Sequence, residues 1–470
     1  SLYNEGLIPT FSFPKNVVGF YIEDEKGKII QKPERSLDVA ISEYAPGREI
    51  VVNKTLYRSG GIYSNATKFR KGNHSFSNPA EAYFNDQNYF KYLYKCTDKS
   101  CAWLSTEKPK NDKCTFCGNE VTQFRPMLKP WGFASENGRP VTVSKDVEYS
   151  YAEKPCYAEP AFDDMKKTKY QNLHVARRES QMITIVNNGP ESDGFSICRK
   201  CGAATVGSEG FDRNKINPPY RTQMKCKHHD YEVVSLGHSF RTDMIVFQLS
   251  INPQSINVTA KGLWFNSAVI SLAETFRLAA SRYLDVEYTD LSVGHRIRKV
   301  NNMTLVDIYL YDNLSSGAGY AFRLADVLEE YFDEVKTVLE YCPSKCKSAC
   351  HDCLKNYWNQ REHRYLNRSE GLELFNWIKN GTLPNFFEPE VQKKMIEPLL
   401  SVLKETDGNV EATLKDTGLS IKYLNKTQNI KIVPAMYSDY YFDNTYELVL
   451  SDKLIDLALP IAYEKFIQCY

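Results

Sequence analysis

Residues 342–353 read Cys342-Pro343-Ser344-Lys345-Cys346-Lys347-Ser348-Ala349-Cys350-His351-Asp352-Cys353, so four cysteines fall within twelve residues. Zinc prefers four tetrahedral sulfur or nitrogen ligands, and ligands a few residues apart on a tight turn can occupy neighbouring vertices. Four-residue spacing could also align three cysteines on one face of a helix. Pro343 and the charged Lys345 and Lys347 argue against such a packing stripe. We therefore expect Cys342, Cys346, Cys350 and Cys353 to bind zinc, with an iron–sulfur cluster as the competing occupant.

Two cysteine groups further upstream also have spacings typical of zinc sites. The first is Cys96-x4-Cys101-x12-Cys114-x2-Cys117, in which the last two cysteines flank a turn-like knuckle. The second combines Cys198 and Cys201 with Cys226 and one histidine. The two-residue spacing from Cys226 favours His229 over His228, and Cys156 or His238 could substitute as the fourth ligand. We expect about three zinc ions in closed sites that stabilise the fold, which leaves Cys156 and Cys469 as unligated thiols.

The composition bears on the cellular compartment of the chain and on how it could bind nucleic acid. The 470 residues include 13 cysteines, and 59 basic against 58 acidic residues give a net charge of +1. A neutral chain has no overall field that would attract nucleic acid, so any such site must be local. The N-terminus lacks a secretory signal pattern, and no run of about 18 apolar residues suggests a membrane span. We expect a cytoplasmic protein with no membrane partner, in which thiols stay reduced and bind metal rather than form disulfides.

Working outward from residues 342–353, hydrophobic periodicity predicts a helix–strand–helix unit. Apolar residues recur at helical spacing over 263–283, a short apolar run at 305–311 indicates a buried strand, and 320–341 is helical again. The expected fold class is a multi-domain α+β or α/β protein. Its expected parts are a β-rich unit at 1–90, a zinc ribbon and connector at 91–155, a second zinc-binding unit at 156–240, the helix–strand–helix zinc-binding domain at 241–380 and an α+β cap at 381–470.

The chain carries no recognisable catalytic motif. It lacks a Gly-x4-Gly-Lys-Ser/Thr phosphate loop, a His-Glu-x-x-His helix and a Gly-x-Ser-x-Gly elbow. Gly317-Ala318-Gly319 follows a strand and opens a helix, and we interpret it as a tight packing turn rather than a phosphate cradle. Four acidic residues near this turn could in principle build a two-metal nuclease site, but solvated or capping roles are favoured; they are Glu274, Asp290, Asp307 and Asp312.

Three stretches in a fixed order carry a family resemblance. They are Leu236-Gly237-His238-Ser239-Phe240-Arg241-Thr242-Asp243, Asp312-Asn313-Leu314-Ser315-Ser316-Gly317-Ala318-Gly319-Tyr320, and the cysteine group at 342–353 with Leu354 and Leu366-Asn367-Arg368. Together they span residues 236–368 and resemble the MrfA-like zinc-binding domain. That domain is attached to, or partners with, superfamily 2 DEAD/DEAH-type helicases. The resemblance implies that the four cysteines of this group bind zinc.

A second resemblance concerns the first part of the chain. Gly6-Leu7-Ile8-Pro9 with Phe13-Pro14, Pro33-Glu34-Arg35-Ser36 and Glu43-Tyr44-Ala45-Pro46-Gly47 are similar to the segment after the second motor lobe in large helicases of this kind. Such helicases occur in bacterial antiphage systems, including DISARM and Druantia. Because motor motifs are missing here, the resemblance implies a motor upstream in the same polypeptide or on a partner chain. ATP would then act only through that motor, with other defence-system subunits as further partners.

If the domain serves a DNA motor, we expect basic residues to contact phosphates and aromatic residues to stack on bases. One candidate group is Arg296, Arg298 and Lys299, and the other is Arg361, Arg364 and Arg368. The spacing of the second group would align it on one helix face, although a solvated face accounts for it equally well. Nearby Tyr357, Trp358 and Tyr365 are expected to pack around the zinc knot rather than stack on bases.

The sequence therefore predicts a non-catalytic, zinc-stabilised region that binds nucleic acid and acts as a scaffold for an ATP-dependent DNA helicase or translocase in bacterial antiviral defence. The alternative is a zinc-stabilised adaptor that docks a motor or effector subunit without contacting DNA. A metal-dependent nuclease is a third and weaker hypothesis.

Overall fold

The computed structural model describes residues 16–64, 80–98, 101–143, 151–153, 155–158, 165–207, 219, 225–259, 263–313, 318–383, 388–406, 408–415, 418–438 and 448–469. Residues 6–14 and 314–317, quoted above for their resemblances, lie outside this set. The chain divides into two compact units. The first comprises residues 1–160, 178–244 and 312–319, and the second comprises 161–177, 245–311 and 320–470. The expected mixed α+β, multi-domain class is confirmed, whereas the five domain boundaries stay predictions.

One sheet of the first unit contains β1 (Val17–Glu23), β2 (Ile29–Gln31), β3 (Glu34–Ser36), β4 (Glu49–Val52), β5 (Thr55–Tyr63) and β9 (Gly132–Pro140). Its order is β2-β1-β9-β5-β4, with β3 paired to β1. The pairing of β1 with β9 is parallel, and β5 pairs with β9 in the antiparallel sense. Two short helices, α1 (Leu37–Glu43) and α2 (Glu81–Phe84), belong to the same unit. The N-terminal β-rich region is thus completed by a strand from about 70 residues further along the chain, β9.

The other strands of the first unit carry two of the cysteine groups. They are β6 (Phe90–Cys96), β7 (Leu104–Ser105), β8 (Val121–Leu128), β10 (Cys156–Tyr157), β13 (Phe195–Cys198) and β14 (Ala204–Val206), with parts of β12 (Leu173–Asn187) and β15 (Tyr231–Ile251). Strands β6 and β8 pair antiparallel, and β13 pairs with both β14 and β15. Each of β6 and β13 ends on a cysteine, so a paired strand holds the first ligand of each group in a fixed position.

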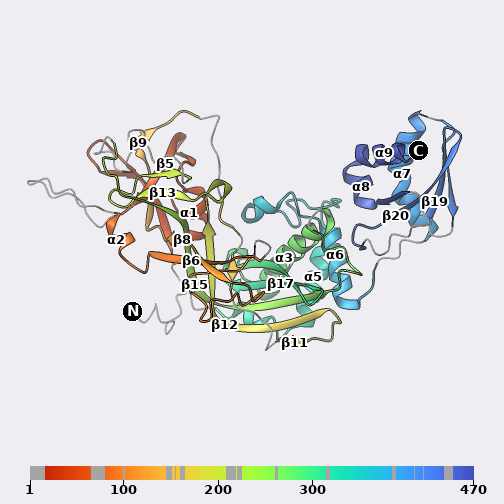
Figure 1. Ribbon diagram of the computed structural model, residues 1–470, viewed down its shortest axis with the longest axis horizontal. Helices are drawn as coiled ribbons and strands as arrows, with labels where there is room; N and C mark the ends of the chain where they lie inside the picture. Colours follow the sequence, from red (N-terminus) through yellow and green to blue (C-terminus); the bar gives the residue numbers. More distant parts are fainter. Residues whose placement is uncertain are drawn as a thin grey trace, which may run out of the picture. The chain divides into compact units, whose positions relative to one another are not determined.

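The second unit is built around α3 (Leu263–Leu284). Phe276 of α3 lies 4.7 Å from Phe247 of β15 and 5.8 Å from Phe332, measured between ring centroids. Phe332 belongs to α5 (Leu328–Glu340) and lies 5.3 Å from Phe375 of α6 (Arg368–Asn380). Helix α3 therefore packs on the strands with one side and on α5 and α6 with another (Figure 1), and the buried helix expected over 263–283 is confirmed.

Strands and a short helix complete this part of the second unit. They are β11 (Lys166–Lys167), β16 (Leu291–Val300), β17 (Met303–Asp312) and α4 (Tyr320–Arg323), with the remaining parts of β12 and β15. Strand β17 confirms the buried strand expected at 305–311. The helix expected over 320–341 is interrupted instead, because Ala325 and Val327 donate to carbonyls three residues back and Asp326 pairs with Arg177.

The end of the second unit is an α+β fold, as expected. It contains α7 (Pro389–Thr406), β18 (Glu411–Lys415), β19 (Gly418–Tyr423), β20 (Lys426–Val433), β21 (Leu448–Ser451), α8 (Asp452–Leu457) and α9 (Leu459–Gln468). The strand order is β18-β19-β20-β21, and the three helices pack on one face of the sheet through residues such as Ile396, Ile455 and Phe466 (Figure 1). Among the described residues, no helix is both long and apolar enough to cross a membrane.

Candidate metal centres and nucleic-acid interface

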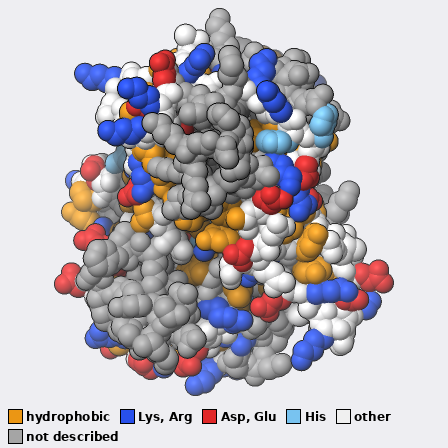
Figure 2. Space-filling view, turned by 90° about the vertical axis from the view of Figure 1, so that its left-hand side faces the viewer, with side chains coloured by type: hydrophobic (Ala, Val, Ile, Leu, Met, Phe, Trp, Pro, Cys, Tyr) orange, Lys and Arg blue, Asp and Glu red, His pale blue; other side chains and the backbone are white. Residues whose placement is uncertain are grey.

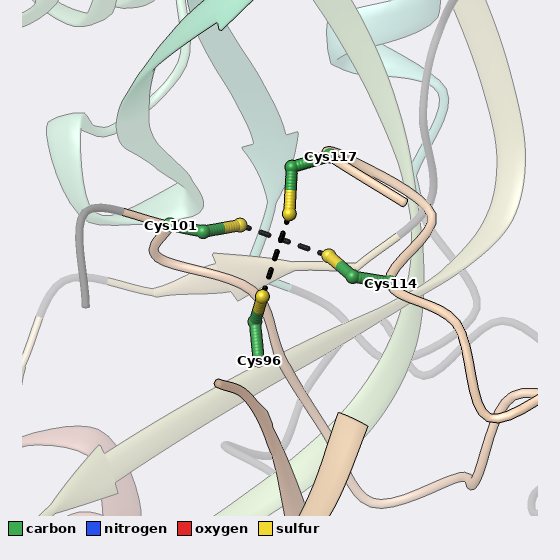
Figure 3. A group of neighbouring side chains, drawn as sticks. All are labelled: Cys96, Cys101, Cys114 and Cys117. Atoms are coloured by element: carbon green, nitrogen blue, oxygen red, sulfur yellow. Dashed lines mark hydrogen bonds between the residues drawn. The ribbon is translucent and has the colours of Figure 1, made fainter. Parts of the chain in front are cut away.

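The first cysteine group converges as its spacing predicts. Figure 3 shows the four thiols pointing toward a common centre, with Sγ–Sγ distances of 3.4 Å from Cys96 to Cys117 and 3.7 Å from Cys101 to Cys114. The knuckle is closed by Gly118, whose N–H donates to the carbonyl of Cys114 and whose φ of +76° favours glycine. The indole N–H of Trp103 donates to Ala158 O at 2.8 Å, which packs a buried ring beside the thiols.

The second group also converges, but with a different histidine from the one expected. Cys198, Cys201 and Cys226 come together with His228, whose Nδ1 lies 3.5 Å from Cys198 Sγ and 3.8 Å from Cys226 Sγ. His229 is not in the group of converging ligand atoms. Residues two apart in an extended segment share one side, and Cys226 and His228 stand two apart just before β15, so this alternation was the missed signal.

The two alternative ligands for this site are engaged elsewhere. The Cys156 thiol donates to Leu104 O, and His238 Nε2 contacts a carboxylate oxygen of Asp38.

The backbone of β5 lies close against the turn that carries Cys198 and Cys201. The N–H of Ile62 donates to Gly202 O at 2.9 Å, and a Cβ on Gly202 would lie 2.4 Å from Ile62 O. Strand β5 therefore braces the turn that carries Cys198 and Cys201.

Substitution of the two neighbouring histidines distinguishes them. We expect His228→Ala to lower the zinc content of the purified chain by about one ion, because a three-ligand site without Nδ1 is open to water and binds zinc more weakly. His229→Ala is the matched control and should keep the full zinc content. Metal analysis after gel filtration measures both; zinc loss only in the His229 variant would contradict the assignment.

The third group follows α5 and is enclosed by α6. Sγ–Sγ distances are 3.6 Å from Cys342 to Cys350, 3.6 Å from Cys346 to Cys353 and 3.8 Å from Cys350 to Cys353. Arg368, the first residue of α6, is only 8% exposed and donates to Leu339 O, to Cys346 O at 3.2 Å and to Cys346 Sγ at 3.9 Å. Its guanidinium therefore supports the loop and offsets thiolate charge, which is a structural role rather than the nucleic-acid contact expected from the sequence.

The three groups fit zinc by distance and by chemistry. Four sulfurs about 2.3 Å from one tetrahedral ion lie about 3.8 Å apart, close to the observed separations. A disulfide would bring two sulfurs to about 2.0 Å, and an iron–sulfur cluster would divide the four thiolates among two or four irons and so spread the group further apart. Within each group, all ligand atoms lie within 4.8 Å of one another. The three sites therefore suit about three zinc ions, each with four ligands and no open position for catalysis.

Contacts within the three groups shift the thiol pKa values in both directions. Burial raises the pKa of Cys96 to about 11 and raises the pKa of Cys101 further, whereas hydrogen bonds lower the pKa of Cys198 and lower the pKa of Cys342 to about 6. A hydrogen bond from Cys201 to Cys198 raises the pKa of the Cys201 thiol as well. Thiolates packed this closely repel one another, so zinc must displace the protons and supply the compensating charge.

The first predicted basic group is mostly internal. Arg296 Nε lies 2.6 Å from Asp307 Oδ2, and Arg298 Nη2 lies 2.9 Å from the same oxygen. Both side chains are about 5% exposed or less, and Asp307 is fully buried. The alternation of β16 sends residues 296 and 298 inward together, and sends only Lys299 to the surface. This arrangement corrects the expectation for Arg296 and Arg298, whose charges are used to pair with Asp307.

The second basic group does not form one helix face. Arg361 lies in a 3₁₀ turn (Tyr357–Glu362), Arg364 follows that turn, and Arg368 begins α6. Arg361 and Arg364 are exposed. Tyr357 and Trp358, expected to pack around the zinc knot, are instead 58% and 51% exposed. The expected continuous helix is absent from these residues because Asn356 caps a short 3₁₀ turn, in which its side chain accepts from the N–H groups of Trp358 and Asn359.

The four acidic residues considered for a nuclease site have other partners. Glu274 accepts from Tyr288 and Asn359, Asp307 from the two arginines, and Asp290 from the N–H of Glu287. Asp312 Oδ2 accepts from the N–H of Ala318 at 2.6 Å. These carboxylates hold turns and strands in place, which removes the geometric support for a two-metal centre.

Charge on the surface is mixed where it can be viewed. On the face in Figure 2, lysine and arginine side chains are interspersed with aspartate and glutamate among the described residues. This matches the net charge of +1 and agrees with the expectation that any nucleic-acid contact is local.

Comparison with known proteins identifies the region around the third zinc group. Residues 272–354 match the family model described as the MrfA Zn-binding domain. The chain contains an MrfA-like zinc-binding region. All four cysteines of the third group fall inside the matched segment, so the resemblance seen in the sequence is confirmed.

One curated relative and two solved structures are similar to parts of this chain. Druantia protein DruE of Escherichia coli (strain UMEA 4076-1) is 30% identical over 440 residues, which cover 87% of this chain and 23% of DruE. The chain thus spans less than a quarter of that relative's length. The DUF1998 helicase MrfA bound to DNA has a TM-score of 0.35 at 11% identity, covering 78% of this chain and 36% of MrfA. MrfA bound to DNA and AMPPNP gives a TM-score of 0.31 at 10% identity, covering 78% and 32%.

Proposed function

We propose that this chain is a non-catalytic, zinc-stabilised region that binds DNA and acts as a scaffold for an ATP-dependent helicase or translocase in bacterial antiviral defence. The observation that carries the proposal is the closed four-cysteine centre within the segment that matches the MrfA Zn-binding domain. The similarity to part of DruE supports a role beside a larger machine. The motor, and with it the use of ATP, lies upstream in the same polypeptide or on a partner chain.

In this proposal the zinc ions hold loops in place and exposed side chains meet the DNA. Each closed site contributes folding free energy without offering a coordination position to a substrate. Lys299, Arg361 and Arg364 are the predicted cationic contacts that remain exposed. Reduced thiols in all three groups suit a cytoplasmic location, which is part of the proposal.

The proposal is tested with the zinc-loaded chain alone and with its motor. The chain alone should bind DNA and hydrolyse no ATP, and adding the motor should restore DNA-stimulated hydrolysis. Robust ATPase activity of the chain by itself would overturn the non-catalytic role. Absence of DNA binding under low-salt conditions would overturn the DNA-binding role.

Reversal of the exposed charges gives a quantitative prediction. The double variant Arg361→Glu/Arg364→Glu should weaken DNA binding and reduce the slope of log affinity against log salt by up to about 2, because each lost phosphate contact releases about one counterion fewer. Lys394→Glu/Lys404→Glu, two exposed lysines on α7, is a charge-matched control. Fluorescence anisotropy across a salt series measures the slope; equal slopes in both double variants would argue against these two contacts.

The adaptor remains a second candidate because of a specific observation. Three of the six predicted DNA contacts, Arg296, Arg298 and Arg368, are buried in structural pairs, which leaves fewer cations for phosphate. An adaptor would bind the motor with unchanged affinity in the double variant and would bind no DNA at all. Motor co-purification measured beside the anisotropy separates the two functions.

A further inference from the structure

We propose that Trp358, on the 3₁₀ turn beside the third zinc group, stacks on an unpaired base of single-stranded DNA. This inference rests on the proposed DNA-binding function and adds the form of DNA and the residue that contacts the base. It reverses the expectation that this aromatic ring packs around the zinc knot. Exposure, rigidity and charge around the ring support it.

The Trp358 ring is exposed, unlike most other tryptophans of the chain. The Trp358 side chain is 51% exposed, whereas Trp103, Trp264 and Trp377 are each 5% exposed or less. Tyr357 and Tyr341, on either side of the cysteine group in the sequence, are 58% and 66% exposed. A single exposed aromatic ring is ordinary, but the Trp358 ring lies edge to face with the exposed Tyr357 ring, with centroids 5.3 Å apart, and neighbouring exposed rings are typical of a binding surface.

Side-chain hydrogen bonds make the turn that holds the ring rigid. Asn356 Oδ1 accepts from the N–H of Trp358 at 2.8 Å, and Asn359 Oδ1 accepts from the N–H of Asn356 at 2.8 Å. Asn359 is only 4% exposed, and its side-chain amide donates to Leu354 O and to Glu274 Oε2 at 3.1 Å. Glu274 belongs to the buried helix α3, so the turn is fixed to the centre of its unit.

Because the turn is rigid, the exposure of the Trp358 ring is a fixed feature of the fold. A flexible loop would let the indole fold back onto apolar surface, whereas this turn holds it half exposed beside the Tyr357 ring. Stacking on a base then removes apolar area from water with little loss of backbone entropy, which is how preorganised sites gain affinity.

Exposed cations outnumber exposed anions close to Trp358 in the sequence. Between residues 341 and 364, the exposed cations are Lys345, Lys347, Arg361 and Arg364, and the exposed anion is Asp352. Thiolates that bind zinc would offset part of this charge, and Arg368, which donates to Cys346 Sγ at 3.9 Å, offsets part of theirs. Cations close in sequence to an exposed aromatic ring can provide phosphate contacts beside a stacked base.

An exposed ring favours single strands over duplex. Bases inside a duplex already stack on one another and present their edges, so a ring reaches a base face there only at a duplex end or by unstacking a base step, which costs a few kcal/mol. A single strand beside a motor offers base faces without that cost. The exposed ring and the nearby cations therefore match single-stranded DNA better than duplex DNA.

The experiment compares ring substitutions on the zinc-loaded chain, using an oligothymidylate of about 15 nucleotides, a matching duplex and the corresponding oligouridylate. Trp358→Ala should weaken single-strand affinity roughly 5- to 150-fold and change duplex affinity less than about twofold, since stacking contributes about 1–3 kcal/mol per base. Trp358→Phe should restore most of the affinity because phenylalanine still stacks. Tyr92→Ala removes another exposed ring, 45% exposed on β6, and should have no effect.

Tryptophan emission supplies a readout that a purely structural role would not change. Wild-type emission should be quenched by oligothymidylate, and the DNA-dependent quenching should largely disappear in Trp358→Phe while binding persists. Unchanged single-strand affinity in Trp358→Ala would overturn stacking, and charge-reversal effects at Arg361 and Arg364 would show that DNA binding itself survives. No DNA binding by the wild-type chain would overturn both proposals, and preference for oligouridylate would assign the surface to RNA.

Discussion

Replacing Cys350 with serine should remove about one of three zinc ions per chain and unfold the region between α5 and α6. Its sulfur lies 3.6 Å from Cys342 Sγ and 3.8 Å from Cys353 Sγ, at the centre of the ligand set. A structural zinc contributes on the order of 10 kcal/mol or more, comparable to the whole stability of a domain. Metal analysis and thermal unfolding measure the two effects, and a zinc chelator should reproduce the unfolding in the wild-type chain.

Cys469→Ser is the matched control for this prediction. Cys469 is exposed at the end of α9, outside the three groups, so its loss should change neither zinc content nor the melting temperature. If Cys350→Ser keeps the full zinc content and melts with the wild type, the third group is not a structural zinc site. If both variants lose stability, the effect belongs to general thiol chemistry rather than to the metal.

The zinc groups could be predicted from the sequence because their ligands are mostly local. Cys114 and Cys117 or Cys350 and Cys353 stand on the same tight turn, so spacing alone fixes which sulfurs can meet. The buried helix α3 and strand β17 were predictable for a similar reason, since hydrophobic periodicity records burial directly. The similarity to an MrfA-like region rests on these same local patterns.

Other features depend on partners that are distant in the sequence. Strand β9 joins the N-terminal sheet from residues 132–140, and no local pattern announces that pairing. The exposure of Trp358 depends on Asn359 reaching Glu274, 85 residues earlier in the chain. From the sequence alone, the basic residues within 296–299 suggest a surface patch, because the sequence does not show which carboxylate pairs with them.

That partner is Asp307, which forms a buried charge cluster with both arginines. Its Oδ2 accepts from Arg296 at 2.6 Å and from Arg298 at 2.9 Å, and its Oδ1 accepts from the Gln248 amide at 2.8 Å. These four residues lie on β15, β16 and β17. Two guanidinium groups share this carboxylate in a site from which water is largely excluded, so its loss would remove a counter-charge from both.

Asp307→Ala should therefore destabilise the chain by about 3–5 kcal/mol, because it leaves two buried guanidinium groups without their counter-charge. Chemical denaturation of the zinc-loaded chain measures the loss. A triple variant, Arg296→Met/Arg298→Leu/Asp307→Leu, should recover much of the stability, since apolar groups of similar volume carry no desolvation penalty. Glu330→Gln, at an exposed position on α5, should be neutral. A stable Asp307→Ala variant with strengthened DNA binding would show that the arginines reach solvent and would return them to the nucleic-acid surface.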